Sequence, residues 1–119
     1  MVTELTVTVD TSAGGHLLQL TGDLDFRNVS YLREVLEDLE LGPGQQLILD
    51  MSGLAFCDST GITVLIAARN RALAAHAGFA LAAVSDRVAR IFRVAGLDQV
   101  FSLYPSPDAA AEAWTRSAT

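Results

Sequence analysis

The sequence contains no lysine, and its basic residues are eight arginines. A phosphate-binding P-loop, Schiff-base catalysis and two-component receiver chemistry all depend on a lysine side chain, so these mechanisms are excluded. Cysteine is almost absent too, since Cys57 is the only one. No intrachain disulfide can therefore form, and nothing indicates an oxidising compartment.

Long hydrophobic runs are also missing, and the eight basic residues are outnumbered by fourteen acidic ones. No window has the length and uniform apolarity of a transmembrane helix, and residues 1 to 5 lack the basic and apolar regions of a signal peptide. We therefore expect a cytoplasmic protein without direct membrane insertion. The formal net charge of -6 argues against a nucleic-acid groove, which needs clustered positive charge, and we expect no nucleic-acid partner.

Half of the 119 residues are hydrophobic, which predicts one globular domain over 1-119 with its core at about 4-115. Near the start, Leu5, Val7 and Val9 alternate with polar residues, the period of a half-buried strand. The turn-forming residues Ser12 to Gly15 then predict a hairpin leading into a second, antiparallel strand that ends in Gly22 to Asp25.

From there, helical and apolar patterns alternate to the end of the chain. The expected elements are a helix around 29-39, a strand at 47-51, a helix from 58 or 59 to before 78, a strand at 79-84, a helix from 85 to 96, an edge strand at 100-103 and a helix from 106 to about 114. This order predicts an α/β fold with a mixed, mostly parallel β-sheet of four to five strands. About four helices should pack mainly on one face.

The segment from Leu47 to Ile66 contains the main functional candidates, and its pattern predicts a strand, a loop and the start of a helix. Polar residues at such a junction meet helix N-terminal amides, which makes Asp58, Ser59 and Thr60 the first candidates for function. Ser59 has two interpretations. It either caps the helix or offers a hydroxyl for modification, and a phosphate of about -1.5 to -2 charges would be tolerated at the positive end of the helix dipole.

Other chemistry has weaker support. Asp23 and Asp25 form a D-x-D pair like that of magnesium-dependent phosphatases, but we favour a solvated turn for Asp23 and a helix cap for Asp25, with the helix starting near Phe26. The serine-hydrolase elbow requires a glycine where Cys57 stands. No metal is assigned because no ligand spacing is present, and no cofactor is expected.

Several motifs together resemble the STAS-domain anti-sigma factor antagonists of bacteria. Gly22-Asp23-Leu24-Asp25 is similar to the family's G-[DE]-[LI]-D segment, Leu47 to Leu54 to its third strand, Phe56 to Ile62 to its D-S-[ST]-G signature, and Arg90 to Leu97 to its later helix and glycine stop. The resemblance covers nearly the whole chain. It implies a STAS-like single domain and a non-catalytic switch rather than an enzyme.

In such a switch, the unphosphorylated antagonist binds an anti-sigma factor that is a serine/threonine kinase, and the sigma factor is freed. Phosphorylation ends the binding, and a serine phosphatase restores it. Carried onto this sequence, the resemblance implies phosphorylation at Ser59, with Thr60 as second choice. The partner-binding surface would be formed by Asp23, Asp25, Asp58, Ser59, Thr60 and Gly61.

Two alternatives remain open at this stage. One is a STAS accessory or scaffold subunit of a stress-signalling complex or a lipid transporter, in which the loop at Ser59 contacts another protein without cycling phosphate. The other is the small magnesium-dependent phosphatase built on Asp23 and Asp25.

Overall fold

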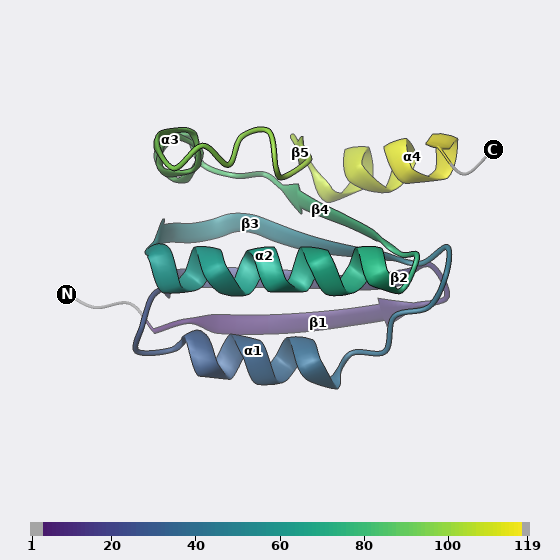
Figure 1. The fold of residues 1–119 in the computed structure, drawn as a ribbon, viewed down its shortest axis with the longest axis horizontal. Coiled ribbons are helices and arrows are strands. Elements are labelled where there is room, and N and C mark those ends of the chain that lie inside the picture. Colours follow the sequence, from purple (N-terminus) through teal and green to yellow (C-terminus); the bar gives the residue numbers. More distant parts are fainter. Residues whose placement is uncertain (1–3, 118–119) are drawn as a thin grey trace.

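The computed structural model describes residues 4–117, and the outermost residues of the predicted domain, 1–3 and 118–119, lie outside that range. Within it, strands and helices follow one another in the predicted order β-β-α-β-α-β-α-β-α (Figure 1). They are β1 (Thr6–Ser12), β2 (Gly15–Leu24), α1 (Val29–Asp38), β3 (Gln46–Cys57), α2 (Ser59–Ala74), β4 (Gly78–Ala82), α3 (Asp86–Val94), β5 (Leu103–Tyr104) and α4 (Pro107–Ser117).

One five-stranded sheet has the order β1-β2-β3-β4-β5. The hairpin of β1 and β2 is antiparallel, whereas each later neighbour is parallel to its predecessor. Each parallel step requires a crossover connection, and the helices between the strands supply it. The predicted mixed, mostly parallel sheet is confirmed.

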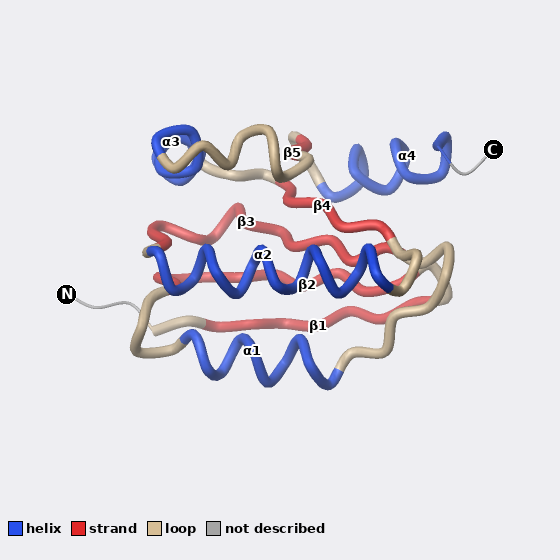
Figure 2. Tube along the Cα trace, in the orientation of Figure 1, coloured by secondary structure: helices blue, strands red, loops and turns tan. Residues whose placement is uncertain are grey.

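Three helices cover one face of the sheet and one covers the other. The main core joins buried residues of α1, α2 and α3 to the sheet, including Leu32, Leu65 and Phe92, each fully buried. A small second core on the opposite face places Ala110 of α4 against Ile48 and the alanines of β4. Figure 2 shows α1 and α2 running along the strands, so the prediction of helices mainly on one face is confirmed.

Several boundaries differ from the sequence prediction. The edge strand predicted at 100-103 is β5 at Leu103–Tyr104, and the strand predicted at 79-84 is β4, which ends at Ala82. β3 does not end at Met51 but continues to Cys57, because two register shifts let it stay paired with β2 through the polar residues that resemble a turn. Gly53 allows the close approach there, since a Cβ atom would lie 2.8 Å from Thr21 Oγ1. The prediction that Asp25 caps a helix starting near Phe26 is wrong, because α1 begins at Val29 with Asn28 in the N-cap position.

The end of the sheet that carries the β1–β2 turn, here called the hairpin end, is held by side chains from distant parts of the chain. Trp114 Nε1 donates to Gly44 O at 2.9 Å, and Gln46 Nε2 donates to Ala110 O at 3.1 Å. His16 Nε2 bonds Glu40 O at 2.7 Å. These bonds join α4 to the start of β3 and to the loop before it, and join the loop after α1 to the start of β2.

Among residues 4–117, no helix is both long enough and apolar enough to cross a bilayer.

Candidate functional site

The predicted site residues meet where β2 and β3 end side by side. Leu24 and Cys57 are register partners at the ends of these two strands, and Asp58 N donates to Leu24 O at 3.1 Å. α2 begins at the next residue, Ser59. The segment 22–25 therefore lies beside the segment 53–61, as is expected of loops at the carboxyl ends of neighbouring parallel strands.

Asp58 links the two segments through its carboxylate. Its Oδ1 accepts from Thr60 Oγ1 at 2.6 Å and from Gly61 N at 3.0 Å, while its Oδ2 accepts from Phe26 N at 3.0 Å. Partial burial raises the pKa of Asp58, but these hydrogen bonds outweigh it and hold the pKa below its ordinary value. Asp58 thus caps α2 and fixes the loop before α1 at the same time.

Ser59 and Thr60 are both exposed, but their hydroxyl groups differ. Thr60 Oγ1 is used in the bond to Asp58. The structure assigns no hydrogen bond to Ser59 Oγ within residues 4–117, so this hydroxyl is free. The capping interpretation of Ser59 is consequently wrong, because Asp58 occupies the N-cap position and Ser59 is the first residue of the helix.

Gly61 sets how closely α2 approaches the sheet. A Cβ atom at this position would lie 2.7 Å from Leu24 Cγ and 2.9 Å from Cys57 Sγ. Only a residue without a side chain lets the first turn of the helix pack directly on the ends of β2 and β3. The glycine therefore positions its neighbours Ser59 and Thr60.

Asp25 is buried and is engaged by Arg27, a residue that the sequence analysis did not single out. Asp25 Oδ1 accepts from Arg27 N at 3.0 Å and from Arg27 Nε at 3.1 Å, and Oδ2 forms an ion pair with Nη2. This hydrogen bonding by the guanidinium holds the pKa of Asp25 below its ordinary value. Asn28 completes the turn by accepting from Asp25 N and donating to Asp23 O at 2.7 Å.

With both oxygen atoms of Asp25 taken by Arg27, the D-x-D pair is not arranged to attack a phosphate or to hold magnesium. Within residues 4–117, the structure brings no three histidine, cysteine or acidic side chains together as a metal site. Burial raises the pKa of the Cys57 thiol to about 12, so this cysteine is not a thiolate at neutral pH. The site offers a surface and a hydroxyl instead of a catalytic constellation.

An open groove of about 480 Å³ lies between the start of α2 and α3. It is lined mainly by apolar atoms, and Ser59 stands among its lining residues. The others are Phe56, Cys57, Asp58, Ile62, Arg90, Ile91, Val94 and Ala95. We call it the α2–α3 groove.

Large apolar side chains are exposed around this groove. Val94 on α3 is 85% exposed, and Phe26, whose backbone is bonded to Asp58, is 72% exposed. Such exposure clustered beside one free hydroxyl is typical of a protein-binding surface. Val94 was detectable in the sequence as an apolar residue outside the buried stripe of its helix, but the sequence analysis missed it.

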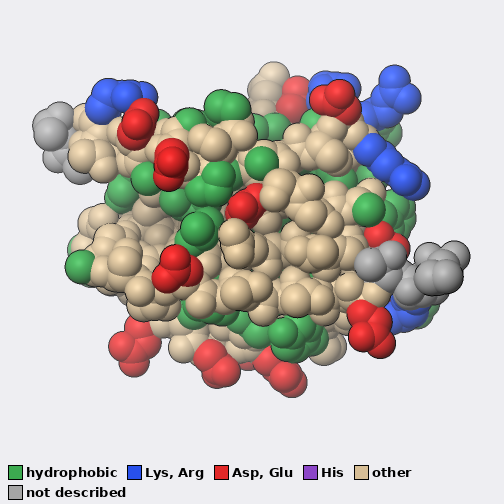
Figure 3. Space-filling model, turned by 180° about the vertical axis from the view of Figure 1, so that it is seen from behind, with side chains coloured by type: hydrophobic (Ala, Val, Ile, Leu, Met, Phe, Trp, Pro, Cys, Tyr) green, Lys and Arg blue, Asp and Glu red, His purple; other side chains and the backbone are tan. Residues whose placement is uncertain are grey.

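The arginines of α3 lie at the same end of the molecule. Arg87, Arg90 and Arg93 are all exposed. Figure 3 shows basic side chains gathered at the end that carries α3, whereas acidic side chains are spread more widely over the view. Of these three arginines, Arg90 lines the groove.

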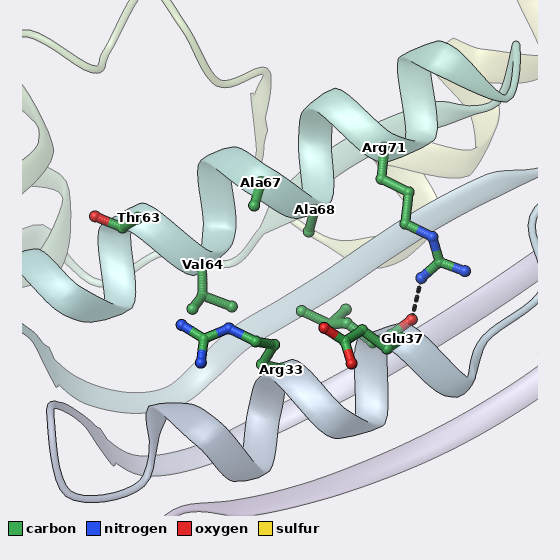
Figure 4. Close-up of a pocket in the computed structure, with 8 residues that line it drawn as sticks. Arg33, Glu37, Thr63, Val64, Ala67, Ala68 and Arg71 are labelled. Carbon is green, nitrogen blue, oxygen red and sulfur yellow. Dashed lines mark hydrogen bonds between the residues drawn. The ribbon is translucent and has the colours of Figure 1, made fainter.

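A second, smaller groove of about 200 Å³ lies between α1 and α2 (Figure 4). At one end of it, Arg71 donates to the carbonyl oxygens of Leu36 and Leu39 and so caps the last turn of α1. Its floor is made by Val64, Ala67 and Ala68, and it holds none of the predicted site residues.

Comparison with known proteins identifies a family for this arrangement. A family model described as STAS domain matches residues 6–110. The anti-sigma-B factor antagonist of Listeria monocytogenes is 26% identical over 84 residues, covering 71% of this chain and 74% of the relative. The anti-sigma-F factor antagonist RsfB of Mycobacterium tuberculosis is 27% identical over 100 residues, covering 84% of this chain and 81% of the relative.

Among solved structures, the crystal structure of an anti-sigma factor antagonist from Mycobacterium paratuberculosis is 26% identical and superposes with a TM-score of 0.80. The alignment covers 94% of this chain and 95% of that one. The residues matched by the family model include α2 and the strands on either side of it in the sequence, β3 and β4.

Proposed function

This chain belongs to the STAS domain family, and from that premise we propose that it is an anti-sigma factor antagonist controlled by phosphorylation of Ser59. The unphosphorylated form binds an anti-sigma factor that is itself a serine/threonine kinase, so that the sigma factor is released in the cytoplasm. The phosphorylated form does not bind, and a serine phosphatase restores the first state. The relatives' description as anti-sigma factor antagonists supports the choice of partner.

The observation that carries this proposal is the free hydroxyl of Ser59. It is exposed at the first residue of α2 and has no competing bond, whereas Thr60 Oγ1 is held at 2.6 Å by Asp58. A kinase must deprotonate and align its acceptor hydroxyl, and of these two hydroxyls only that of Ser59 can turn toward the enzyme without breaking a bond of the fold. Ser59 is therefore the acceptor, and Thr60 is the second choice.

The transfer itself needs no group of this chain other than the acceptor. Ser59 Oγ bonds to the γ-phosphorus of ATP as the bond from that phosphorus to its bridging oxygen breaks. ADP leaves, and the hydroxyl proton passes to the kinase. In the dephosphorylation step, water in the phosphatase attacks the phosphorus of phosphoserine, the bond from phosphorus to Ser59 Oγ breaks, and free Ser59 and inorganic phosphate result.

The α2–α3 groove and the residues around it form the partner-binding surface in this proposal. Exposed Phe26 and Val94 supply apolar anchors on either side of Ser59. Asp58 and Gly61 hold the first turn of α2 in place, and Asp25 holds Arg27. Asp23 contributes through its carbonyl to the turn that presents Phe26.

A phosphate on Ser59 would change this surface more than the fold. It adds about -1.5 to -2 charges at a helix N-terminus, which the helix dipole tolerates. The same charge at the centre of a mostly apolar contact must be desolvated when the partner binds, and that opposes association.

The direct test compares Ser59→Ala with Thr60→Val in the presence of the cognate kinase and ATP. Ser59→Ala should keep binding the kinase and take up no phosphate. Thr60→Val should still be phosphorylated. Phosphate uptake by Ser59→Ala at the wild-type rate would refute the assignment.

A second measurement separates the switch from a scaffold. The intact mass of the protein isolated from its own cell, before and after phosphatase treatment, should reveal one removable phosphate located at Ser59. If no growth condition yields such a phosphate, the accessory role in a complex is favoured over the switch.

A further inference from the structure

One arginine shares the α2–α3 groove with Ser59. Ser59 belongs to α2 and Arg90 to α3, and both line this one groove. Figure 1 shows α3 at the end of the sheet where α2 begins, which is why residues 31 positions apart face the same cavity. The other two arginines of α3, Arg87 and Arg93, are not among the lining residues.

Arg90 is also available. It is exposed, and the structure assigns it no hydrogen bond or ion pair within residues 4–117. Arg27, a second cation close enough to Asp58 to feel its charge, is engaged because it pairs with the buried carboxylate of Asp25. Moving Arg27 to a new anion would leave Asp25 without its partner, whereas moving Arg90 breaks no bond.

We propose that Arg90 binds the phosphate of phosphorylated Ser59 across the α2–α3 groove and thereby covers the apolar surface that a partner needs. The inference rests on the proposed function for the phosphate itself. It adds an intramolecular bond that closes the groove, where the proposed function relies only on charge repulsion against the partner.

The chemistry of the two groups fits this bond. A guanidinium presents paired N–H donors that match two phosphate oxygens, and such charge-assisted bonds are among the strongest in proteins. The charged groups that face the new phosphate are Asp58 beside it, the Arg27–Asp25 pair on the loop before α1 and Arg90 on α3. Asp58 repels the phosphate, so the phosphate gains most by turning away from Asp58 and toward α3.

The bond would change what the groove exposes. The apolar side chains of Ile62, Ile91 and Val94 line the same groove as Ser59 and Arg90. A phosphate–guanidinium bridge over these side chains would shield them, so that the groove presents charged groups to a partner instead of apolar ones. The phosphorylated protein then loses its docking surface before any partner arrives.

The test uses full-length protein carrying phosphoserine at position 59, inserted during translation so that no kinase is required. Titration of the ³¹P resonance gives the second pKa of the phosphate, which is ordinarily about 6. Arg90→Ala should raise this pKa by about 0.5 or more, since a bound cation favours the dianion. The phosphate pKa in Arg90→Lys should lie between the values of wild type and Arg90→Ala, because lysine keeps the positive charge but lacks the paired N–H donors.

Arg87→Ala is the matched control on the same helix and should leave the titration unchanged. An equal rise in Arg87→Ala and Arg90→Ala, no rise in Arg90→Ala, or a larger rise in Arg27→Ala than in Arg90→Ala would each overturn the proposal. These outcomes are independent of the proposed function, which fails instead if the native protein never carries phosphate at Ser59.

Closure of the groove has its own readout. A paramagnetic co-solute should relax the methyl groups of Ile91 and Val94 less in the phosphoserine protein than in the serine protein, and Arg90→Ala should remove the difference. Equal relaxation in the two wild-type forms would refute closure even if the phosphate pKa depends on Arg90.

Discussion

The two ends of the sheet are built differently. At the hairpin end, Trp114, Gln46 and His16 each bond a backbone carbonyl far away in sequence, and the loops there are fastened to α4 and β3. At the opposite end, here called the Ser59 end, the hydroxyl of Ser59 and the guanidinium of Arg90 have no such bond within residues 4–117, and Val94 is 85% exposed.

We infer from this difference that side chains at the hairpin end serve mainly the stability of the fold, and that those at the Ser59 end serve mainly recognition. Side chains at the hairpin end gain free energy by completing the hydrogen bonds of the fold, so their loss should destabilise it. Side chains at the Ser59 end have hydrogen-bonding groups that the fold does not use and that a partner or a phosphate could bind in the proposed function. Their loss should therefore affect function while the free energy of unfolding stays nearly constant. Asp58 is the exception, because it belongs to the Ser59 end and yet makes three bonds of the fold.

The largest effect is expected for Gly15→Ala at the hairpin end. Gly15 has a φ of +133°, and a Cβ atom there would lie 2.0 Å from Gln46 O. We expect a loss of about 3 kcal/mol or more in the free energy of unfolding, from backbone strain and overlap together. Urea denaturation measures it.

Its control is the neighbouring Gly14→Ala, because the nearest atom to a Cβ there is Ser12 Oγ at 3.8 Å. Gly14→Ala should be nearly neutral. Similar losses in the two variants would show that the hairpin as a whole is sensitive, and would remove the argument from the contact with Gln46.

Trp114→Ala should have the next largest effect. The indole donates to Gly44 O and packs over Gly78, where a Cβ atom would lie 2.8 Å from its Cε3. Because the side chain is only half-buried, we expect a loss of about 2 kcal/mol rather than the larger values of core tryptophans. Trp114→Phe keeps the ring packing and should lose only about 1 kcal/mol, the share of the hydrogen bond. Equal losses in both would contradict this division.

Asp58 lies at the Ser59 end but makes bonds of the fold, so Asp58→Ala should lower the free energy of unfolding. We expect a loss of about 1 to 2 kcal/mol, as is usual for a helix N-cap. The pKa of Asp58 is lowered in the folded state, so its stabilisation is fully present above the ordinary carboxyl pKa of 3.8. It is lost as the pH falls below that value and through the folded-state pKa. Wild type should therefore lose stability relative to Asp58→Ala as the pH falls below about 4. A constant difference across that range would show that the carboxylate charge is not used.

Ser59→Ala should have the smallest effect on stability. Its hydroxyl has no bond to lose within residues 4–117, so we expect a change within about 0.5 kcal/mol. The same variant should lose all phosphate uptake, which makes it the sharpest contrast between the two ends. A thermal melt together with a phosphorylation assay measures both, and a loss above about 1 kcal/mol would mean that Ser59 serves the fold after all.

The sequence predicted the elements well where local signals agree with packing. Ser85 caps α3 by accepting from Val88 N, and Gly96 ends this helix with a φ of +76° while Leu97 N bonds Phe92 O. The start of α2 was also placed within one residue. Caps and glycine stops are local, so they can be recognised without the rest of the chain.

It failed where a residue's role depends on another strand. Asp58 and Ser59 are equally good caps by residue type. In the structure Asp58 Oδ1 accepts from Gly61 N and so caps α2, while Phe26 N, from the loop after β2, holds Oδ2. The polar residues after Met51 resemble a turn until β2 is seen to pair with them. The groove that joins Ser59 to Arg90 depends on where α3 packs, which no local pattern reveals.

The two register shifts between β2 and β3 limit how many residues can be inserted or deleted before the site. From Leu18 to Leu24, β2 advances by six residues while its partner advances by eight, from Leu49 to Cys57. Since side chains alternate between the faces with a period of two, one extra residue would turn Cys57 outward, and a pair of extra residues restores its inward direction. Relatives of this chain should therefore add or remove residues before the position of Ser59 only in even numbers.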